Sequence, residues 1–315
     1  MKHPLALALA LALAAAPVAF AQPHAKSHAV HAQTQPNAAN PFFQDSPLPL
    51  HYPQFDRIKD SDFAPAFDRG MAEQLKEIQA IANNPQKATF DNTIVAMEKS
   101  GRTLTRAGTV FGNLVGADTN PVRDKLDAEY SPKFAAHRDA IYLNPKLFAR
   151  VQALYDQRAS LGLDAEGVRL VEKYYQDFVR AGAKLSDADK AKLKQVNAEL
   201  ASLGTQFSQN VLAERNDLAV VVDTRDELKG LSDEAIAAAQ KAAKDHKLEG
   251  KYVIELQNTT IQPPLTYLEN RALRERIFKA SVSRGARGNQ WDNTGIVSKV
   301  AKLRAEKARM LGYPT

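Results

Sequence analysis

A long apolar stripe with helical spacing constrains the fold of this 315-residue chain more than any other feature. Ser186 before it is a favourable N-cap, and Asp189 three residues later approaches a capping box. A coiled-coil seam would also show this spacing, but no heptad is sustained elsewhere, so the pattern favours one long core helix. The stripe steps by three or four residues through Leu193, Val196, Leu200, Leu203, Phe207 and Val211.

The same spacing recurs after Asn40 and predicts several further helices. We expect Pro132 to kink or break one of them, and Pro263-Pro264 to precede another. Asn144-Pro145 and Gly182 are favourable start and stop signals. The predicted helices cover about 62–82, 91–118, 121–142, 164–181, 233–245 and 265–283, with others beginning at 145 and at 292 or 293.

Two short β-branched runs, at about 218–222 and 252–256, are the only strand candidates that we identify. The segment between them reads as helical. They could therefore pair in parallel, or join a sheet that is completed elsewhere. The predicted class is mainly α with a minor β element.

The first 21 residues have the pattern of a secretory signal peptide. An apolar run from Leu5 to Ala16 precedes Ala19 and Ala21, which fit the A-x-A rule for cleavage after Ala21. An uncleaved anchor is the alternative, but the run is shorter than the roughly 20 residues that span a bilayer. We expect an exported, soluble protein, periplasmic or secreted, with no membrane contact after cleavage. Residues 22–40 are polar and Pro-rich, which predicts a disordered linker before a globular part at 41–315.

The amino-acid composition excludes several kinds of functional site. The chain has no cysteine, which excludes disulfides, thiolate metal sites and cysteine nucleophiles. Its 42 basic and 36 acidic residues are interspersed along the sequence, without a basic stripe that carries aromatics. Nucleic-acid binding is therefore not expected.

No catalytic motif is present. We find neither G-x-S-x-G nor G-x-x-x-x-G-K-[ST], and none of the seven histidines is followed by Glu, so H-E-x-x-H is absent. A metal site at His24, His28 and His31 in the linker is less favoured than incidental composition. A site assembled from the separated His51, His137 and His246 is a remote alternative. We therefore predict no catalytic and no metal-binding residue.

One loop carries candidate binding residues. Arg284-Gly285-Ala286-Arg287-Gly288 is a basic, glycine-rich connection between two predicted helices. Backbone N–H groups and guanidinia in such a loop can bind a carboxylate, which makes Arg284 and Arg287 candidate substrate contacts. A plain connecting loop is nevertheless the interpretation that we favour.

From Asn40 to its end, the sequence resembles the N-terminal half of bacterial peptidyl-dipeptidases of the thimet-oligopeptidase family of zinc metallopeptidases. None of the similar stretches is a catalytic motif. The stretches are NPFFQDSPLPLHYPQFDRIKDSDFAPAFDRGMAEQ at 40–74, IANNPQKATFDNTIVAMEKSG at 81–101, IYLNPKLFARVQALYDQRASLGLD at 141–164, DFVRAGAKLSDADKAKLKQVNAELASLGTQFSQNVL at 177–212, LQNTTIQPPL at 256–265, LRERIFKASVSRGARG at 273–288 and KLRAEKARMLGYPT at 302–315.

The resemblance implies a mostly helical protein with a deep channel, in which zinc is held by the two histidines of H-E-x-x-H and a later Glu. In the full-length family this zinc enzyme removes C-terminal dipeptides from oligopeptides, and we expect it to be monomeric. Those ligands follow the LGYP segment, which here is followed only by Thr315. No catalytic residue can be carried over, so we expect a fragment or a terminated reading frame that is inactive alone. The alternative is a secreted helical protein that binds peptides or a partner without catalysis.

Overall fold

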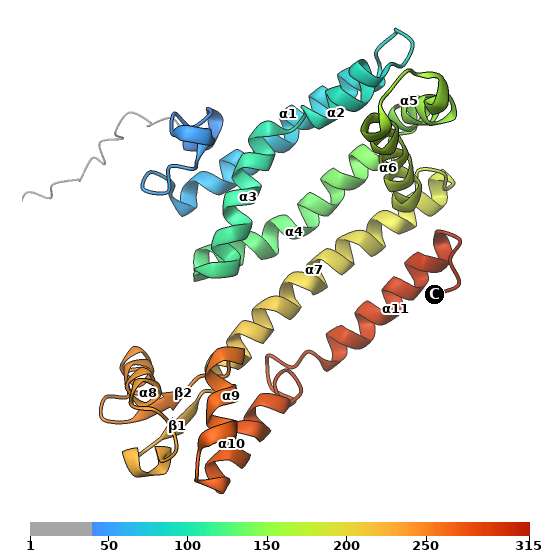
Figure 1. Cartoon of the computed structure of the whole chain (residues 1–315). Coiled ribbons are helices and arrows are strands. Elements are labelled where there is room, and N and C mark those ends of the chain that lie inside the picture. Colours follow the sequence, from blue (N-terminus) through green and yellow to red (C-terminus); the bar gives the residue numbers. More distant parts are fainter. Residues whose placement is uncertain (1–39) are drawn as a thin grey trace, which may run out of the picture. The chain divides into compact units, whose positions relative to one another are not determined.

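The computed structural model describes residues 40–315, except for the side chain of Asn258. The predicted signal peptide with Ala19 and Ala21, and the linker up to residue 39, lie outside the described residues. The fold is mainly α, as predicted (Figure 1). Its helices are α1 (Phe63–Ala82), α2 (Ala96–Glu98), α3 (Arg102–Ala117), α4 (Pro121–Tyr142), α5 (Pro145–Asp156), α6 (Ala165–Ala181), α7 (Asp187–Asp217), α8 (Asp233–Asp245), α9 (Asn258–Tyr267), α10 (Arg271–Val282) and α11 (Thr294–Met310).

The strands are β1 (Val220–Val222) and β2 (Tyr252–Ile254), which form a small antiparallel sheet. The expected positions are confirmed, but the suggested parallel pairing is wrong. Helix α8 packs on β2, and the two strands run in opposite directions, with Val221 opposite Val253. Within residues 40–315 no further strand joins the pair. Its core gathers residues of both strands and of α8, α9 and α10 around the fully buried Leu228, Leu256 and Ile277.

Helices α1, α3 and α4 enclose an aromatic core. Phe63 and Phe67 of α1 are fully buried and pack edge-on against Phe111 of α3, with ring centroids 5.0 and 5.2 Å apart. Tyr130 of α4 closes this cluster, 5.0 Å from Phe67. A second core lies between the C-terminal half of α1 and helices α5 and α6. Burial of these large side chains is the main force that holds this region together.

The predicted continuous helix over 91–118 is wrong. The segment begins with a π-helical turn, Phe90–Val95, and is interrupted at Gly101, whose φ of 72° is left-handed. The Gly101 N–H donates to Glu77 Oε2 at 2.8 Å, and Gln74 occupies the place of a Cβ. Contacts with α1 therefore fix a glycine break that helical periodicity alone does not reveal.

Helix α3 approaches α1 closely at another glycine. A Cβ added to Gly70 would lie 2.7 Å from the backbone nitrogen of Leu104. Only a residue without a side chain fits at this contact.

Pro132 lies inside α4 and does not break it, so of the two predicted outcomes only a kink stays a prediction. The predicted position of Pro263 and Pro264 is wrong, because they lie inside α9 instead of before it. The two helices pack against α7 and against the small sheet, respectively. We attribute their continuity to this tertiary packing, which offsets the hydrogen bonds that the prolines remove.

The predicted end signals of the helices are confirmed. Asn144 Oδ1 accepts the N–H of Lys146 at 3.0 Å, and Ser186 Oγ accepts the N–H of Asp189 at 3.1 Å. Gly182 ends α6 in the left-handed conformation, with φ 99°. Local sequence therefore fixes where these helices begin and end.

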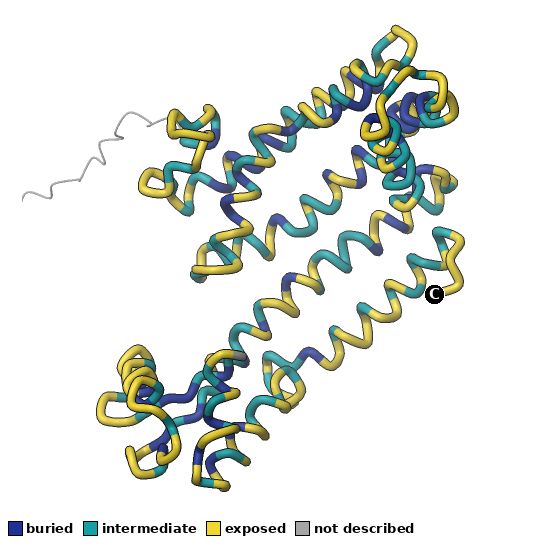
Figure 2. The backbone as a smooth tube through the Cα atoms, viewed as in Figure 1, coloured by how far each residue is buried: buried dark blue, intermediate teal, exposed yellow. Residues whose placement is uncertain are grey.

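The 31-residue helix α7 is the long core helix that the sequence predicts, and it packs along α4. Its burial changes along its length (Figure 2). Leu193 and Val196 near its start are buried, whereas Phe207 and Val211 near its end are 39% and 41% exposed. The buried residues of the second half are polar instead: Thr205, Asn210 and Glu214.

Helix α11 lies beside α7, and none of its residues is buried. Its contacts with α7 include polar pairs. Lys307 Nζ donates to Asn197 Oδ1 at 2.7 Å, and Lys299 pairs with Glu199. In the part of the chain described here, no helix is long and apolar enough to cross a membrane.

Candidate functional site

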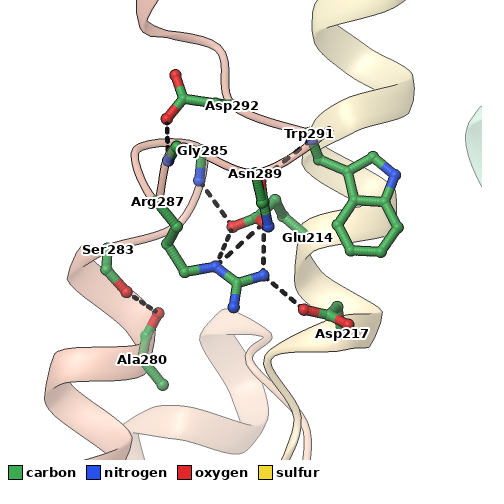
Figure 3. Close-up of polar contacts among 10 residues, drawn as sticks. Glu214, Asp217, Ala280, Ser283, Gly285, Arg287, Asn289, Trp291 and Asp292 are labelled. Atoms are coloured by element: carbon green, nitrogen blue, oxygen red, sulfur yellow. Dashed lines mark hydrogen bonds and ion pairs between the residues drawn. The ribbon is translucent and has the colours of Figure 1, made fainter.

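The loop between α10 and α11, residues 283–293, contains both candidate arginines and folds against the C-terminal half of α7 (Figure 3). We call it the α10–α11 loop. Its anchor on α7 is Glu214, whose side chain is completely buried. An isolated buried carboxylate is unfavourable, so its hydrogen-bond partners determine whether the loop is stable.

Glu214 is surrounded by donors from the loop. The Gly285 N–H donates to Oε2 at 3.0 Å, and Asn289 Nδ2 donates to Oε1 at 2.5 Å. Arg287 donates from Nε at 3.1 and 3.2 Å and from Nη2 at 2.6 Å. One guanidinium, one amide and one backbone N–H therefore satisfy a single carboxylate.

These partners strongly favour the ionised carboxylate. Hydrogen bonds from Arg287, and then those from Gly285 and Asn289, outweigh desolvation and lower the pKa of Glu214 to about 2. Glu214 and Asp217 together raise the pKa of Arg287. Asp217 lies 2.5 Å from Arg287 Nη2 and is 42% exposed. The buried carboxylate is thus the dominant partner, and the exposed one is secondary.

Short turns shape the rest of the loop. Asn289 Oδ1 accepts the Trp291 N–H at 3.1 Å, which orients the amide toward Glu214. Asp292 accepts the Gly288 N–H at 2.6 Å and the Thr294 N–H at 2.8 Å, and so joins the loop to the start of α11.

Asn293 fixes the end of the loop to α7. It is buried, and its Oδ1 accepts from Asn210 Nδ2 at 2.9 Å. Its own amide donates to the carbonyl of Phe207 at 3.2 Å. The loop is therefore a defined structure with two buried polar attachments, one at Glu214 and one at Asn210.

Arg284 points to backbone carbonyls. Its Nη1 donates to the carbonyl of Leu256 at 2.9 Å, and its Nε donates to that of Ser281 at 3.1 Å. The side chain thus ties the end of α10 to the segment that follows β2.

An apolar hollow of about 380 Å³ opens beside the loop. Phe207 and Val211 of α7, Ala286 of the loop and Val297 of α11 supply its apolar lining, and Arg284 is at its edge. Val297 is 54% exposed. We call it the Phe207 hollow. It can accommodate an apolar side chain of another molecule, next to a cation.

The two predicted contact residues therefore lie in the same loop, but their guanidinia bind acceptors of the chain itself. The carboxylate that the glycine-rich loop was expected to bind has a counterpart in Glu214, on α7. Contact of Arg284 or Arg287 with a substrate stays a prediction. Sequence reasoning missed Glu214. It follows Val211 by three residues, but the stripe is exposed at Phe207 and Val211, so helical spacing alone does not mark Glu214 as buried.

The histidines considered as metal ligands are separated in the fold. His51 Nδ1 bonds to the carbonyl of Ser46 at 2.9 Å, whereas His246 lies 3.7 Å from Glu255. His137 is buried, and its Nε2 lies 2.7 Å from Gln74 Oε1. Across residues 40–315 no three His, Asp or Glu side chains are grouped so as to hold a metal ion. His24, His28 and His31 lie outside the described residues.

Sequence comparison places the chain among peptidases. It is 45% identical to dipeptidyl carboxypeptidase of Escherichia coli over 275 residues, which are 87% of this chain and 40% of that protein. The dipeptidyl carboxypeptidase of Salmonella typhimurium is 44% identical over 277 residues, 88% of this chain and 41% of that protein. Oligopeptidase A of Haemophilus influenzae is 26% identical over 267 residues, 84% of this chain and 39% of that protein.

No protein-family model matches the chain. The chain spans about two fifths of the length of these relatives. The identity to the two carboxypeptidases extends over nearly nine tenths of this chain, so the resemblance noted in its sequence is confirmed. Over these residues the chain is similar to part of dipeptidyl carboxypeptidase, and more distantly to part of oligopeptidase A.

Proposed function

We propose that this chain is a portion of an exported zinc peptidase that removes C-terminal dipeptides from oligopeptides. The observation that carries the proposal is the 45% identity to dipeptidyl carboxypeptidase over 275 residues. The leader-like first 21 residues, with Ala19 and Ala21 at the expected cleavage site, support export to the periplasm or the medium. Oligopeptides are the proposed substrates.

The residues of this chain do not fit a peptidase zinc site. H-E-x-x-H is absent from the sequence, and the described residues hold no group of three suitable ligands. We therefore propose that the zinc ligands belong to residues beyond this sequence, and that the chain alone does not cleave peptides. Zinc would supply a Lewis acid and an activated water molecule to the complete protein.

The chain's own contribution would be a shaped helical surface. Glu214 and Asn210 hold the α10–α11 loop on α7, and the loop in turn borders the Phe207 hollow. We propose that this surface contacts substrate or the remainder of the enzyme, with Arg284 and Arg287 as the candidate substrate contacts.

Reading the DNA beyond the codon for Thr315 tests this proposal. We expect H-E-x-x-H in the same frame, and we expect the product of the whole frame to release C-terminal dipeptides in a chelator-sensitive reaction. A frame without the motif, or a product that has the motif but no such activity, would contradict the proposal.

The Phe207 hollow favours a second candidate function, peptide binding without catalysis. Phe207 and Val211 are exposed apolar residues beside a basic loop, which suits an apolar side chain next to a carboxylate. Titration of this chain with a fluorescent oligopeptide tests whether the hollow binds peptides. Saturable binding that Val211→Asp abolishes, together with a reading frame that lacks H-E-x-x-H, would support the second candidate; an absence of binding would contradict it.

A further inference from the structure

A second, polar hollow lies away from the α10–α11 loop. It has a volume of about 370 Å³, and α4, α6, α7 and α11 all contribute to it. Three cations line it: Arg138 of α4, Arg180 of α6 and Lys307 of α11. Three helices thus bring positive charges to one place, which we call the Lys307 hollow.

The cations are poorly satisfied by the protein. Within residues 40–315 neither Arg138 nor Arg180 forms an ion pair or donates a side-chain hydrogen bond, although Arg138 stacks on the ring of Tyr142 with its Cζ 4.9 Å from the centroid. Lys307 is half-buried, and among described residues its only hydrogen bond is to Asn197 Oδ1. Burial lowers the pKa of Lys307; the charge of Asp139 opposes this shift, and that of Arg138 adds to it.

Among the described residues, the two acids of the hollow form no ion pair with these cations. Asp177 pairs with Lys173 at 2.6 Å. Asp139 is 4% exposed; its Oδ1 accepts from Asn197 Nδ2 at 2.8 Å, and its Oδ2 has no partner in the described part of the chain. Burial raises the pKa of Asp139, although the hydrogen bond from Asn197 and the charges of Lys307 and Arg138 oppose the shift.

We propose that the Lys307 hollow binds a compact oxyanion, a phosphate or a carboxylate. Arg138 and Arg180 present guanidinia with several N–H donors, and Lys307 retains two ammonium protons beyond the one given to Asn197. An oxyanion would accept from all three cations, and it would relieve the repulsion between Arg138 and Lys307. A bound anion would also link α4, α6 and α11, and so it would stabilise the position of α11 beside α7.

This site is independent of the proposed peptidase activity. None of its residues belongs to the α10–α11 loop or lines the Phe207 hollow. The oxyanion could be inorganic phosphate or a free carboxylate, and these two sources share the chemistry that the hollow recognises.

Thermal unfolding of the whole chain in sodium phosphate, sodium acetate and sodium chloride at matched ionic strength tests the proposal. An anion at ten times its dissociation constant is expected to raise the midpoint by roughly 3 °C, whereas chloride at equal ionic strength does not. Arg180→Gln and Lys307→Gln should each weaken the apparent affinity by about tenfold or more. Arg169→Gln is the matched control, because this arginine is on the same helix as Arg180, is 64% exposed and pairs with Glu172 outside the hollow.

A saturable shift with phosphate alone would identify phosphate as the ligand, and one with acetate alone would identify a carboxylate. The proposal is overturned if neither anion gives a saturable shift, or if the shift is the same in Arg180→Gln as in wild type and Arg169→Gln. Isothermal titration of phosphate and acetate into folded Lys307→Gln at low temperature provides the second measurement. If Lys307→Gln binds either anion as tightly as wild type does, the proposal is also overturned.

Discussion

Replacement of Glu214 by glutamine tests whether the α10–α11 loop depends on one buried carboxylate. The substitution keeps the size of the side chain but removes its charge and turns one acceptor oxygen into a donor. Whichever oxygen is replaced, that donor then faces Arg287 and either Gly285 or Asn289. We therefore expect the loop to lose most of its attachment to α7 at this point, with no cavity formed.

The expected magnitude follows from the contacts. Four donor groups converge on the fully buried carboxylate: one backbone N–H, one amide and two guanidinium nitrogens. Hydrogen bonds to charged groups contribute about 1.5 to 3 kcal/mol each, but such neighbours are not additive. Removal of one member of a buried pair costs about 3 to 5 kcal/mol, because the other is left uncompensated. Arg287 keeps Asp217 as a partner, so we expect about 3 kcal/mol.

Urea unfolding at pH 7, followed by circular dichroism, measures this difference in the free energy of unfolding. Asp217→Asn is the matched control, since Asp217 contacts the same guanidinium but is 42% exposed, and its loss should cost about 1 kcal/mol or less. Equal losses for the two variants, or a loss below about 1 kcal/mol for Glu214→Gln, would refute the reasoning.

Three further predictions concern acid stability and helix packing. The pKa of Glu214 is about 2 in the folded state against 4.5 for a free side chain, so its stabilisation is fully present above pH 4.5 and is lost as the pH falls toward 2. The difference in free energy of unfolding between wild type and Glu214→Gln should therefore shrink over that range, and a constant difference in urea titrations would contradict this. Burial lowers the pKa of His137 below 6.5, so wild type should lose stability as the pH falls below 6.5, whereas His137→Gln should not. Parallel profiles of unfolding free energy against pH for the two proteins would contradict this prediction. Gly70→Ala should lower the free energy of unfolding by about 1 to 3 kcal/mol, because its Cβ would lie 2.7 Å from the backbone of Leu104. The control Gly108→Ala has no neighbour within 4 Å and should raise the free energy of unfolding by about 0.5 to 1 kcal/mol. Calorimetric midpoints that move in the same direction for the two variants would contradict this.

The parts of the fold that depend on local signals could be predicted from sequence. Caps such as Asn144 and Ser186, the stop at Gly182 and the helical spacing of Leu193 and Val196 act within a few residues, so helix positions follow from them directly. The direction of β2 could not be predicted in this way. It is set by tertiary packing, which no short segment encodes.

Tertiary contacts also explain the other errors. The break at Gly101 is fixed by Glu77 and Gln74 of α1, so it could not be read from the segment itself. Within the candidate site, the glycine-rich sequence predicted recognition of a carboxylate. Its counterpart in the fold, Glu214, lies about seventy residues earlier in the chain. Sequence identifies the chemistry of such a loop, but only the fold identifies an internal partner.

A peptidase assay of this 315-residue chain tests the central claim most directly. The chain is incubated with zinc and a blocked oligopeptide that has a free C-terminus, and dipeptidyl carboxypeptidase of Escherichia coli serves as the positive control. The account predicts no released dipeptide above a blank, and no zinc retained after gel filtration. Dipeptide release that requires this chain and is abolished by a chelator would contradict it, because it would show that a working zinc site exists without H-E-x-x-H.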